Sequence, residues 1–404
     1  MKPDGQDMLR VGEARTDARH ILILPSWYPA SADDIGGSFF RDQALALKDA
    51  GIDVGVLSLT MRSLRNPLSS WRKRGGLYFE NDQGIATYRG AMINWTPKMW
   101  RLAARRFARL TLNVYGRYEA RFGRPDLVHV HSSLLAGAGA MALHEKYGIS
   151  FVVSEHSSVF RRPKMPQVGL RVAREIAEVA EARFAVSSSF AKMLAEKLGM
   201  PYDKWSVMPN AVAVDFLEAP LIEKTGKAFR FLHVSGLDAN KNATIILSAF
   251  AERFAGHEAV ELVIGGDGPF RAALIEQTKR LGISKQVKFP GKLSRIEVRR
   301  EMRDCNVFVL SSRFETFGVV LIEALATGRP VIATRCGGPE DIVDEDSGFL
   351  VANDNALALA DAMENLYCQR EKWNAEELRN SCERRFGPVA ITREWQQIYA
   401  DILS

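Results

Sequence analysis

Short apolar runs alternate with helical stretches along most of this 404-residue chain, and this alternation limits the possible folds more than any other feature. Strands that alternate with helices form parallel sheets covered by helices on both faces. We therefore predict an α/β fold built on parallel sheets. The apolar runs of the first half lie at residues 20–24, 53–59, 127–131, 151–154, 184–187 and 206–208.

The pattern starts again after a turn-rich stretch at residues 210–227. A chain of this length exceeds one ordinary core, so we expect two doubly wound, Rossmann-like domains facing each other across a deep cleft. The predicted domains are residues 20–212 and 213–387, preceded by a flexible tail at residues 1–19. The runs of the second half lie at residues 229–235, 260–264, 287–289, 307–310 and 331–333.

The last helical stretch, residues 388–404, carries a continuous apolar stripe. Trp395, Ile398, Tyr399 and Ile402 follow one another at i, i+3, i+4 and i+7, which places them on one helix face. Chain ends fray unless they are tied down. We therefore predict that this helix packs back on the first domain.

Composition excludes several classes of protein. The chain is 47% hydrophobic and 25% charged, as expected for a soluble globular protein. Its four cysteines are widely spread without a CxxC pair, which argues against a disulfide framework or a zinc site and suits a reducing cytosol. No apolar run reaches 18 residues, so no transmembrane helix is expected. No histidine, cysteine or aspartate grouping has metal-ligand spacing, so we predict no protein-built metal site and no cofactor.

Positive charge is concentrated in the first half. Residues 1–215 hold 30 Lys and Arg against 21 Asp and Glu, a net charge of +9. Within them Arg101, Arg105 and Arg109 follow at i, i+4 spacing in the Trp- and Phe-containing stretch Trp95–Leu110, and Trp71–Arg74 adds a second basic cluster. This pattern fits either the solvated face of a core helix or a helix held on an anionic membrane surface. We expect no nucleic-acid partner, because no nucleic-acid motif is present.

Two glutamates, Glu315 and Glu323, enclose an unusual segment. Glu323 is the only polar side chain from Val319 to Ala326, and a helix that is apolar on every face is usually buried. A buried carboxylate is costly unless hydrogen-bond donors surround it. Glu315 lies just before the helix, where backbone N–H groups point outward. A ligand with hydroxyls and phosphates would suit both acids. Alternatively, Glu323 pairs with a core arginine and Glu315 is an exposed helix-start acid.

Polar and glycine-rich residues follow the predicted strands at their carboxyl ends, where parallel sheets bind ligands. Gly265–Gly268 lacks the full GxGxxG spacing, so a tight turn is its simpler interpretation. His131 ends a strand and is either functional or structural. The residues at strand ends include Gly36, Gly37, His131, Glu155, His156, Ser235, Gly236 and Lys241.

Together these residues resemble the retaining glycosyltransferases of family 4, which have the GT-B fold. The resemblance rests on the Glu315-to-Glu323 spacing with Thr-Phe-Gly after the first glutamate. It extends over nearly the whole chain. The other similar segments are Gly36–Phe39, Asp126–His131, Ala185–Ser189, Met208–Asn210, Leu262–Pro269, Gly328–Thr334 and Gly337–Glu340.

The resemblance implies roles for the segment around the two glutamates. Glu323 would accept hydrogen bonds from the ribose hydroxyls of a nucleotide, and Glu315 would contact the donor sugar. Phe317, Gly318 and Val319 would offer backbone N–H groups to the diphosphate or the sugar. These residues would form the donor site.

It also implies roles outside that segment. Lys241 would neutralise the leaving diphosphate, Leu293 would lie against the base, and Gly37 would approach the diphosphate from the first domain. His131 would sit beside the reacting sugar, so that His131, Lys241 and Glu315 form the catalytic set. Glu155 and His156 would lie on the acceptor side.

The chain departs from the family at one important position. Where the family has Val-Gly-Arg-Leu, this chain has Val234-Ser235-Gly236-Leu237. The donor-side residues Ser235 and Gly236 therefore supply no guanidinium. Lys241 would act alone or with another cation, such as Arg313 or Arg329.

The resemblance implies an enzyme that moves a sugar from a nucleotide-diphosphate sugar, UDP- or GDP-linked, to a hydroxyl acceptor with retention. The product would belong to cell-surface polysaccharide or lipid-linked oligosaccharide synthesis, at the cytoplasmic face of the membrane. Two alternatives stay open on the same fold. One is a non-catalytic nucleotide-sugar-binding protein, which Gly236 makes plausible, and the other is a nucleotide-sugar epimerase.

Overall fold

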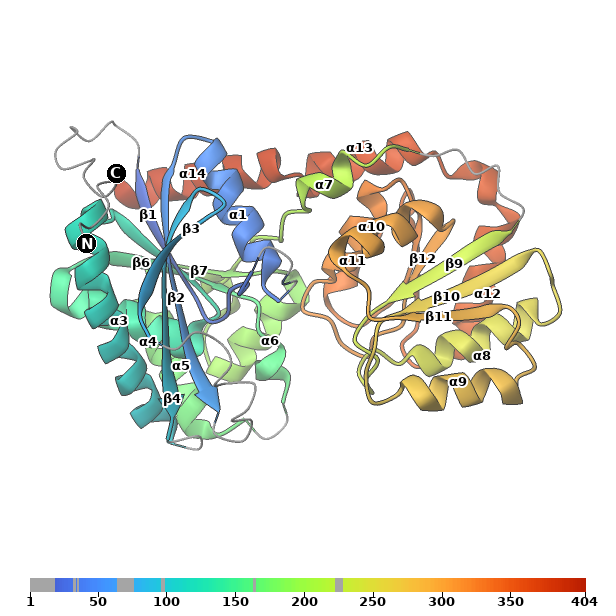
Figure 1. Ribbon diagram of the computed structural model, residues 1–404, viewed down its shortest axis with the longest axis horizontal. Helices are drawn as coiled ribbons and strands as arrows, with labels where there is room; N and C mark the ends of the chain where they lie inside the picture. Colours follow the sequence, from blue (N-terminus) through green and yellow to red (C-terminus); the bar gives the residue numbers. More distant parts are fainter. Residues whose placement is uncertain are drawn as a thin grey trace, which may run out of the picture.

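The alternating pattern folds into two sheets that lie side by side in the computed structural model (Figure 1). The structure describes residues 19–31, 34, 36–63, 76–95, 99–162, 165–221 and 228–404. The predicted tail, apart from residue 19, and the basic cluster Trp71–Arg74 lie outside the described residues.

The first sheet has eight strands in the order β3-β4-β2-β1-β5-β6-β7-β8. All neighbouring strands are parallel except the pair β3 and β4. Chain order reverses between β1 and β5, so a ligand crevice is expected at their carboxyl ends. The strands are β1 (His20–Pro25), β2 (Asp53–Ser63), β3 (Tyr78–Asp82), β4 (Ile85–Asn94), β5 (Leu127–His131), β6 (Ser150–Glu155), β7 (Ala182–Ala185) and β8 (Ser206–Val207).

Helices cover both faces of the first sheet. One face packs against α3, α4 and α5, and the other packs against α1 and the C-terminal helix α14. Each layer buries the apolar stripe of its helices on the sheet. The helices of this domain are α1 (Ser38–Asp49), α3 (Trp100–Phe122), α4 (Ser133–Tyr147), α5 (Gln167–Val179), α6 (Ser188–Leu198) and α14 (Pro388–Leu403).

The second sheet has six parallel strands in the order β11-β10-β9-β12-β13-β14. This is the order of a Rossmann sheet, whose ligands bind at the carboxyl ends of the two strands where chain order reverses. Those strands are β9 and β12. The six strands are β9 (Phe229–Val234), β10 (Val260–Gly265), β11 (Val287–Gly291), β12 (Val307–Leu310), β13 (Val331–Thr334) and β14 (Gly348–Val351).

The second domain is also covered on both faces. Helices α8, α9 and α12 contribute to one buried cluster, and α10, α11 and α13 contribute to another. The predicted α/β fold with two doubly wound domains is thereby confirmed. These helices and the short linker helix are α7 (Val214–Leu217), α8 (Ala243–Phe254), α9 (Arg271–Arg280), α10 (Arg295–Asp304), α11 (Val319–Ala326), α12 (Ala356–Cys368) and α13 (Ala375–Phe386).

The chain crosses between the domains twice, before α7 and between α13 and α14 (Figure 1). The two crossings are joined, because Val212 N–H donates to Phe386 C=O at 2.8 Å. Beyond the second crossing, α14 lies on the first sheet. There Trp395 packs on His129 at a centroid distance of 4.5 Å, and Tyr399 Oη lies 2.6 Å from His129 Nδ1.

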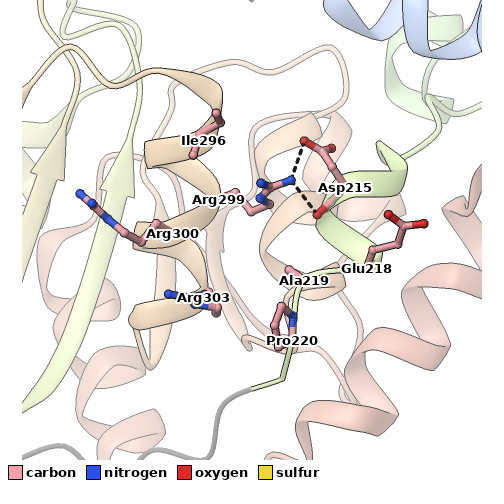
Figure 2. Close-up of a pocket in the computed structure, with 8 residues that line it drawn as sticks. All are labelled: Asp215, Glu218, Ala219, Pro220, Ile296, Arg299, Arg300 and Arg303. Atoms are coloured by element: carbon pink, nitrogen blue, oxygen red, sulfur yellow. Dashed lines mark hydrogen bonds and ion pairs between the residues drawn. The ribbon is translucent and has the colours of Figure 1, made fainter.

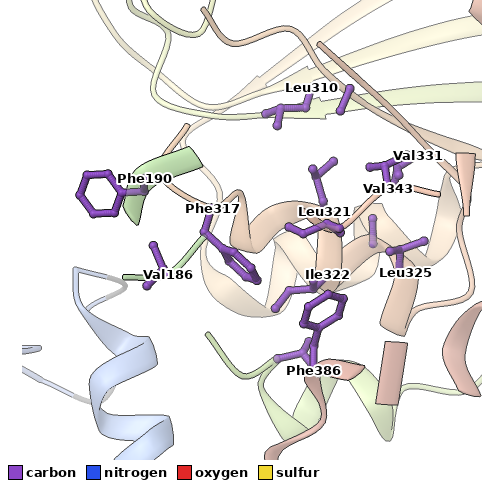
Figure 3. Close-up of a cluster of buried hydrophobic side chains, with 14 of the residues drawn as sticks. Val186, Phe190, Leu310, Phe317, Leu321, Ile322, Leu325, Val331, Val343 and Phe386 are labelled. Carbon is purple, nitrogen blue, oxygen red and sulfur yellow. The ribbon is translucent and has the colours of Figure 1, made fainter. Parts of the chain in front are cut away.

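Helix α11 is held by a hydrophobic cluster that spans both domains (Figure 3). Leu321, Ile322 and Leu325 point into it together with Phe317 and Phe386, and residues of α6 extend it into the first domain. The almost entirely apolar composition of this helix, in which Glu323 is the one polar residue, thus reflects burial on most of its surface. The remaining face is turned to the interdomain cavity.

Candidate active site

A cavity of about 440 Å³ lies between the two domains. Its first-domain wall comes from the beginning of α1, and its second-domain wall comes from α11 and from the segments that follow β9, β10 and β11. The cavity therefore lies at the carboxyl ends of the second sheet, as the strand order requires. Its described lining residues include Ser38, Phe39, Asp42, Ser235, Gly236, Asp267, Lys292, Leu293, Arg295, Val319, Val320 and Glu323.

Glu323 is the acidic residue that α11 presents to this cavity. Val319, Val320 and Glu323 are the α11 residues that line it, and their i, i+1, i+4 spacing puts them on one helix face. None of the described residues donates a hydrogen bond to the carboxyl of Glu323. The acid is therefore open to a ligand, and the alternative of a hydrogen-bonded core arginine does not hold.

Burial raises the pKa of Glu323 to about 7, although the positive charge of Arg295 opposes the rise. The negative charges of Asp215 and Asp42 add to it. In the empty site this carboxyl is thus close to half protonated at neutral pH. Hydroxyl donors from a ligand would stabilise the ionised form.

Glu315 and Lys241 form an ion pair, and neither is among the described residues that line the cavity. Lys241 Nζ donates to Glu315 Oε1 at 2.5 Å, and the hydroxyl of Ser312 donates to the same oxygen at 2.7 Å. A backbone bridge to Gly337 fixes the position of Glu315. Lys241 therefore has a defined position before any ligand binds, as a preorganised cation requires.

Gly318 allows α11 to begin at the site. It is the N-cap residue with φ of 107°, a left-handed conformation that favours glycine. The side chain of Phe317, the preceding residue of the predicted donor site, is buried in the interdomain core. Only the backbone of Phe317 is therefore available to a ligand. The free N–H groups at the start of α11 point where an anion would be stabilised.

The loop after β9 forms another part of the wall. Ser235 lines the cavity, and its hydroxyl contacts His233 Nε2 at 2.7 Å. A Cβ atom on Gly236 would meet nothing within 4 Å, so the backbone here does not itself require glycine. Leu293 also lines the cavity. Its Cδ1 packs on Gly265, where it would lie only 2.6 Å from an added Cβ atom.

The glycine cluster after β10 lets its backbone pack closely on the backbone of the loop that follows β9. A Cβ on Gly266 would come within 1.8 Å of the Ser235 carbonyl oxygen, and one on Gly268 within 2.5 Å of the Leu237 carbonyl oxygen. This close approach requires glycine. The interpretation of Gly265–Gly268 as a tight turn is therefore the correct one.

Gly37 opens α1 on the first-domain side. Its φ is 81°, and a Cβ atom there would lie 2.7 Å from Trp27 Cδ1. Both facts require glycine at this position. Gly37 thus lets α1 begin directly beside the cavity, which Ser38 and Phe39 line.

His131 and His156 form a buried pair at the carboxyl ends of β5 and β6. His131 Nδ1 lies 3.1 Å from His156 Nε2. Burial holds the pKa of His131 well below its ordinary value and lowers that of His156 to about 3, so both rings are neutral. Among the described residues, His131 Nε2 has no hydrogen-bond partner. A buried polar atom without a partner points to a missing ligand group.

Glu155 does not face a ligand. It is fully buried, and its Oε2 accepts from the N–H and hydroxyl of Ser133 at 2.8 and 2.7 Å. Its Oε1 accepts from the N–H groups of His156 and Ser157 at 3.0 and 2.9 Å. The carboxylate satisfies the start of α4 and the turn after β6. The expectation that Glu155 contacts an acceptor therefore finds no support in its geometry.

The two cations suggested as helpers of Lys241 are engaged elsewhere. Arg313 pairs with Asp354 at 2.9 Å, and Arg329 precedes β13, at the amino end of the strand. The cavity instead contains Lys292 and Arg295. Sequence reasoning missed both, although the capping box of Ser294 and Glu297 marks a helix start immediately after Leu293.

A second cavity, of about 400 Å³, lies between α10 and the linker (Figure 2). Arg299 pairs there with Asp215 at 3.1 Å. Ile296, Arg300 and Arg303 complete the helix side. None of the predicted site residues lines it.

Two features are absent from the described residues. No group of three or more histidine, cysteine or acidic residues is arranged to hold a metal ion. None of the helices in this part of the chain combines the length and hydropathy needed to span a bilayer.

Comparison with known proteins agrees with this architecture. The family described as Glycosyltransferase Family 4 matches residues 36–216, and the family described as Glycosyl transferases group 1 matches residues 219–385. Among solved structures, the sucrose-phosphate synthase of Thermosynechococcus elongatus aligns with a TM-score of 0.73 at 20% identity, covering 95% of this chain and 99% of that one. Anabaena HepE in complex with UDP aligns with a TM-score of 0.70 at 19% identity, covering 95% and 100%.

Curated relatives are similar over most of the chain. The glycogen synthase of Mycobacterium tuberculosis is 26% identical over 360 residues, 85% of each chain. A putative teichuronic acid biosynthesis glycosyltransferase of Bacillus subtilis is 25% identical over 375 residues, 88% of this chain and 91% of the relative. With one family model on each domain, the chain is a nucleotide-sugar glycosyltransferase that belongs to family 4 and has the two-domain GT-B fold.

Proposed function

We propose that the protein transfers a sugar from a nucleoside-diphosphate sugar to a hydroxyl acceptor with retention of anomeric configuration. The observation that carries this is the pair of acidic groups on either side of the α11 start. Glu323 lines the cavity, and Glu315, which precedes α11, holds Lys241 in an ion pair. Ribose hydroxyls suit the first acid, and a diphosphate suits Lys241 together with the N–H groups of α11.

The chemical step depends on the negative charge that grows on the leaving diphosphate. Lys241 and the backbone N–H groups at Gly318 and Val319 are fixed donors for that charge. His131 Nε2, buried and without a partner among the described residues, suits a hydroxyl of the reacting sugar.

The arrangement of acids supports a retaining step without an enzymic nucleophile. Asp42 is the one first-domain carboxylate among the described residues that line the cavity, and Arg295 holds it at 3.0 Å. It is thus not free to act as a nucleophile. We propose that the acceptor attacks the face from which the diphosphate leaves, with a diphosphate oxygen taking the acceptor proton.

A panel of UDP-, GDP- and ADP-sugars tests the function. A sugar nucleotide that binds the folded protein raises its melting temperature by mass action, and we expect one base to give a clearly larger shift than the others. Release of the matching nucleoside diphosphate, with a glycosylated acceptor, would then show transfer. Binding without such release would favour the non-catalytic binding protein, and a changed donor sugar without transfer would favour the epimerase.

The acceptor is proposed to be lipid-linked, with the first domain resting on the anionic cytoplasmic surface of a membrane. Around the start of α3, Trp95 is 63% exposed and Met99 is 59% exposed. Arg101, Arg105 and Arg109 are exposed beside them on α3. Exposed aromatic and basic side chains on one surface are typical of interfacial attachment. The relation to a putative teichuronic acid enzyme supports a surface-polysaccharide product.

Replacing Arg101, Arg105 and Arg109 together by glutamine is expected to weaken binding to anionic vesicles roughly thirtyfold, about 2 kcal/mol. Each basic residue near such a surface contributes about 1 kcal/mol, and Arg101 contributes less because Glu175 lies 3.5 Å away. Vesicle sedimentation at low and high salt measures this. Turnover on a soluble acceptor should be unchanged.

The control replaces three similarly exposed cations of the second domain, Lys279, Lys288 and Arg300, by glutamine. This variant should sediment like the wild type. Equal binding of the wild type to neutral vesicles, or none to anionic ones, would make the α3 arginines a merely solvated helix face.

A further inference from the structure

Arg295 lies where three acidic residues from three different elements come together. Its Nη2 donates to Asp42 of α1 at 3.0 Å and to Asp215 of α7 at 3.1 Å. Its Nε donates to the other oxygen of Asp215 at 3.3 Å. The third acid, Glu323 of α11, lines the same cavity as Arg295. One guanidinium thus contacts the first domain and the linker, and it lies at the cavity that α11 of the second domain lines.

The position of Arg295 is set by the beginning of α10. The hydroxyl of Ser294 accepts from Glu297 N–H at 3.3 Å, and the Glu297 carboxylate accepts from Ser294 N–H at 2.8 Å. This capping box starts the helix directly after Leu293, and it is a strong helix-start signal. Arg295 is the first helical residue and therefore lies at the cavity edge.

Part of this guanidinium is still available. None of the described residues accepts a hydrogen bond from Arg295 Nη1, while Nη2 and Nε are fully used. The side chain is 27% exposed. A planar guanidinium held on one edge offers its other edge to a ligand in a defined direction.

Building on the donor site proposed above, we propose that Arg295 is the positioning residue of that site. Through Asp42 it holds the first domain against the nucleotide-binding wall, and it keeps Glu323 ready to accept hydrogen bonds from the ribose. It thereby supplies, from α10, a cation at a cavity whose Gly236 supplies none.

The charges around Glu323 determine the direction in which each substitution shifts its pKa. Arg295 favours the ionised carboxylate, whereas Asp42 and Asp215 disfavour it. Lys292 and Asp267 also line the cavity, with opposite charges. Removing the charge of Arg295 should therefore raise the pKa of Glu323, and removing the charge of Asp42 should lower it. A residue that only stabilised the fold would produce no such pair of opposite shifts.

Calorimetric titration of the full chain with UDP, GDP and ADP from pH 6 to pH 9 tests this. In the wild type, affinity for the preferred nucleotide should rise through the pKa of Glu323. Arg295→Met should move that midpoint up by about one pH unit, the lower end of the effect of a close opposite charge. It should also weaken binding at pH 7 about tenfold.

Asp42→Asn should move the midpoint down and weaken binding severalfold at every pH, because the contact between the domains is lost. Asparagine has nearly the same shape as aspartate, so Asp42→Asn is expected to fold. It can therefore test the proposal even if Arg295→Met does not fold. Midpoints that do not move, or that move in the same direction in both variants, would overturn the proposal.

Arg299→Met is the matched control. Arg299 lies one turn further along α10, pairs with the same Asp215 and is 32% exposed. It lines the second cavity (Figure 2) and not the donor cavity. Its loss should leave the midpoint unchanged.

Glu323→Gln separates this proposal from the function on which it rests. The variant reports the pH dependence that comes from the nucleotide phosphates alone. If it binds all three nucleotides as tightly as the wild type, the donor-site assignment itself fails. If it binds weakly while the Arg295 and Asp42 variants keep the wild-type midpoint, only the role of Arg295 fails.

Discussion

Replacing Lys241 by alanine is expected to lower turnover at least about a hundredfold, the scale of losing one strong electrostatic donor to a developing charge. We expect Lys241 to carry more of this role than Arg295, because Arg295 is paired with both Asp42 and Asp215. Gly236 supplies no guanidinium, and Arg313 is held by Asp354. Initial rates at saturating sugar nucleotide measure the loss. Because the effect falls on the transition state, kcat should drop more than the affinity for the donor.

Gly236→Arg provides the matching gain. A Cβ atom at this position meets nothing within 4 Å, so the first side-chain atom of an arginine introduces no clash. In the Lys241→Ala background it should restore part of the lost turnover. Lys279→Ala, which removes an exposed lysine of the same domain, should have no effect. Near-normal turnover of Lys241→Ala would show that the donor-site assignment is wrong.

Replacing Glu323 by alanine is expected to weaken nucleotide binding by about 1.5–3 kcal/mol, roughly 10- to 150-fold, as hydrogen bonds to a charged group are lost. The carboxyl faces the cavity without a hydrogen-bond donor among the described residues. It is therefore available to ribose hydroxyls. Calorimetry on a folded variant measures the loss, and unchanged affinity would contradict the assignment.

The same carboxyl should make the empty protein less stable as pH rises. Its pKa is about 7 when folded and about 4.3 in an unfolded chain. Between these values the folded state binds more protons than the unfolded state, so the free energy of unfolding falls with increasing pH. Glu323→Ala removes this loss. Without ligand, the melting temperature of the variant minus that of the wild type should be larger at pH 8 than at pH 5. Thermal unfolding in matched buffers measures this difference.

The fold was predictable where strands read as continuous apolar runs, and it was not where they carry charges. Strands β3 and β4 were missed, because Arg89 interrupts the apolar pattern of β4. In the structure Arg89 is buried, since Glu80 and Asp82 of β3 lie 2.7 and 3.6 Å from it. A local pattern cannot show that a charge will find its partner in a neighbouring strand. The short β14 was also missed.

The site was predictable to the extent that strand ends indicate it. That rule brought Ser235 and Gly236 to the cavity, which Glu323 and Leu293, the latter implied by the family resemblance, also line. The same rule misjudged Glu155, because a strand's carboxyl end is also where the next helix needs a partner for its N–H groups.

Arg295 could not be found in this way. It belongs to the charged stretch Arg295–Asp304, which resembles an exposed helix. Its partner Asp42 lies 253 positions away. Only the folded chain shows that these two residues meet at a cavity wall.

The position of α14 has a consequence for biosynthesis. The first sheet receives its outer helix, including the contact between Tyr399 and His129, from residues that are synthesised after every strand of both sheets. All strands of the second sheet have been synthesised by then. Domains generally fold in the order in which they are made, but here the nascent first domain must wait with one apolar face open. The domain that is translated first is therefore completed last.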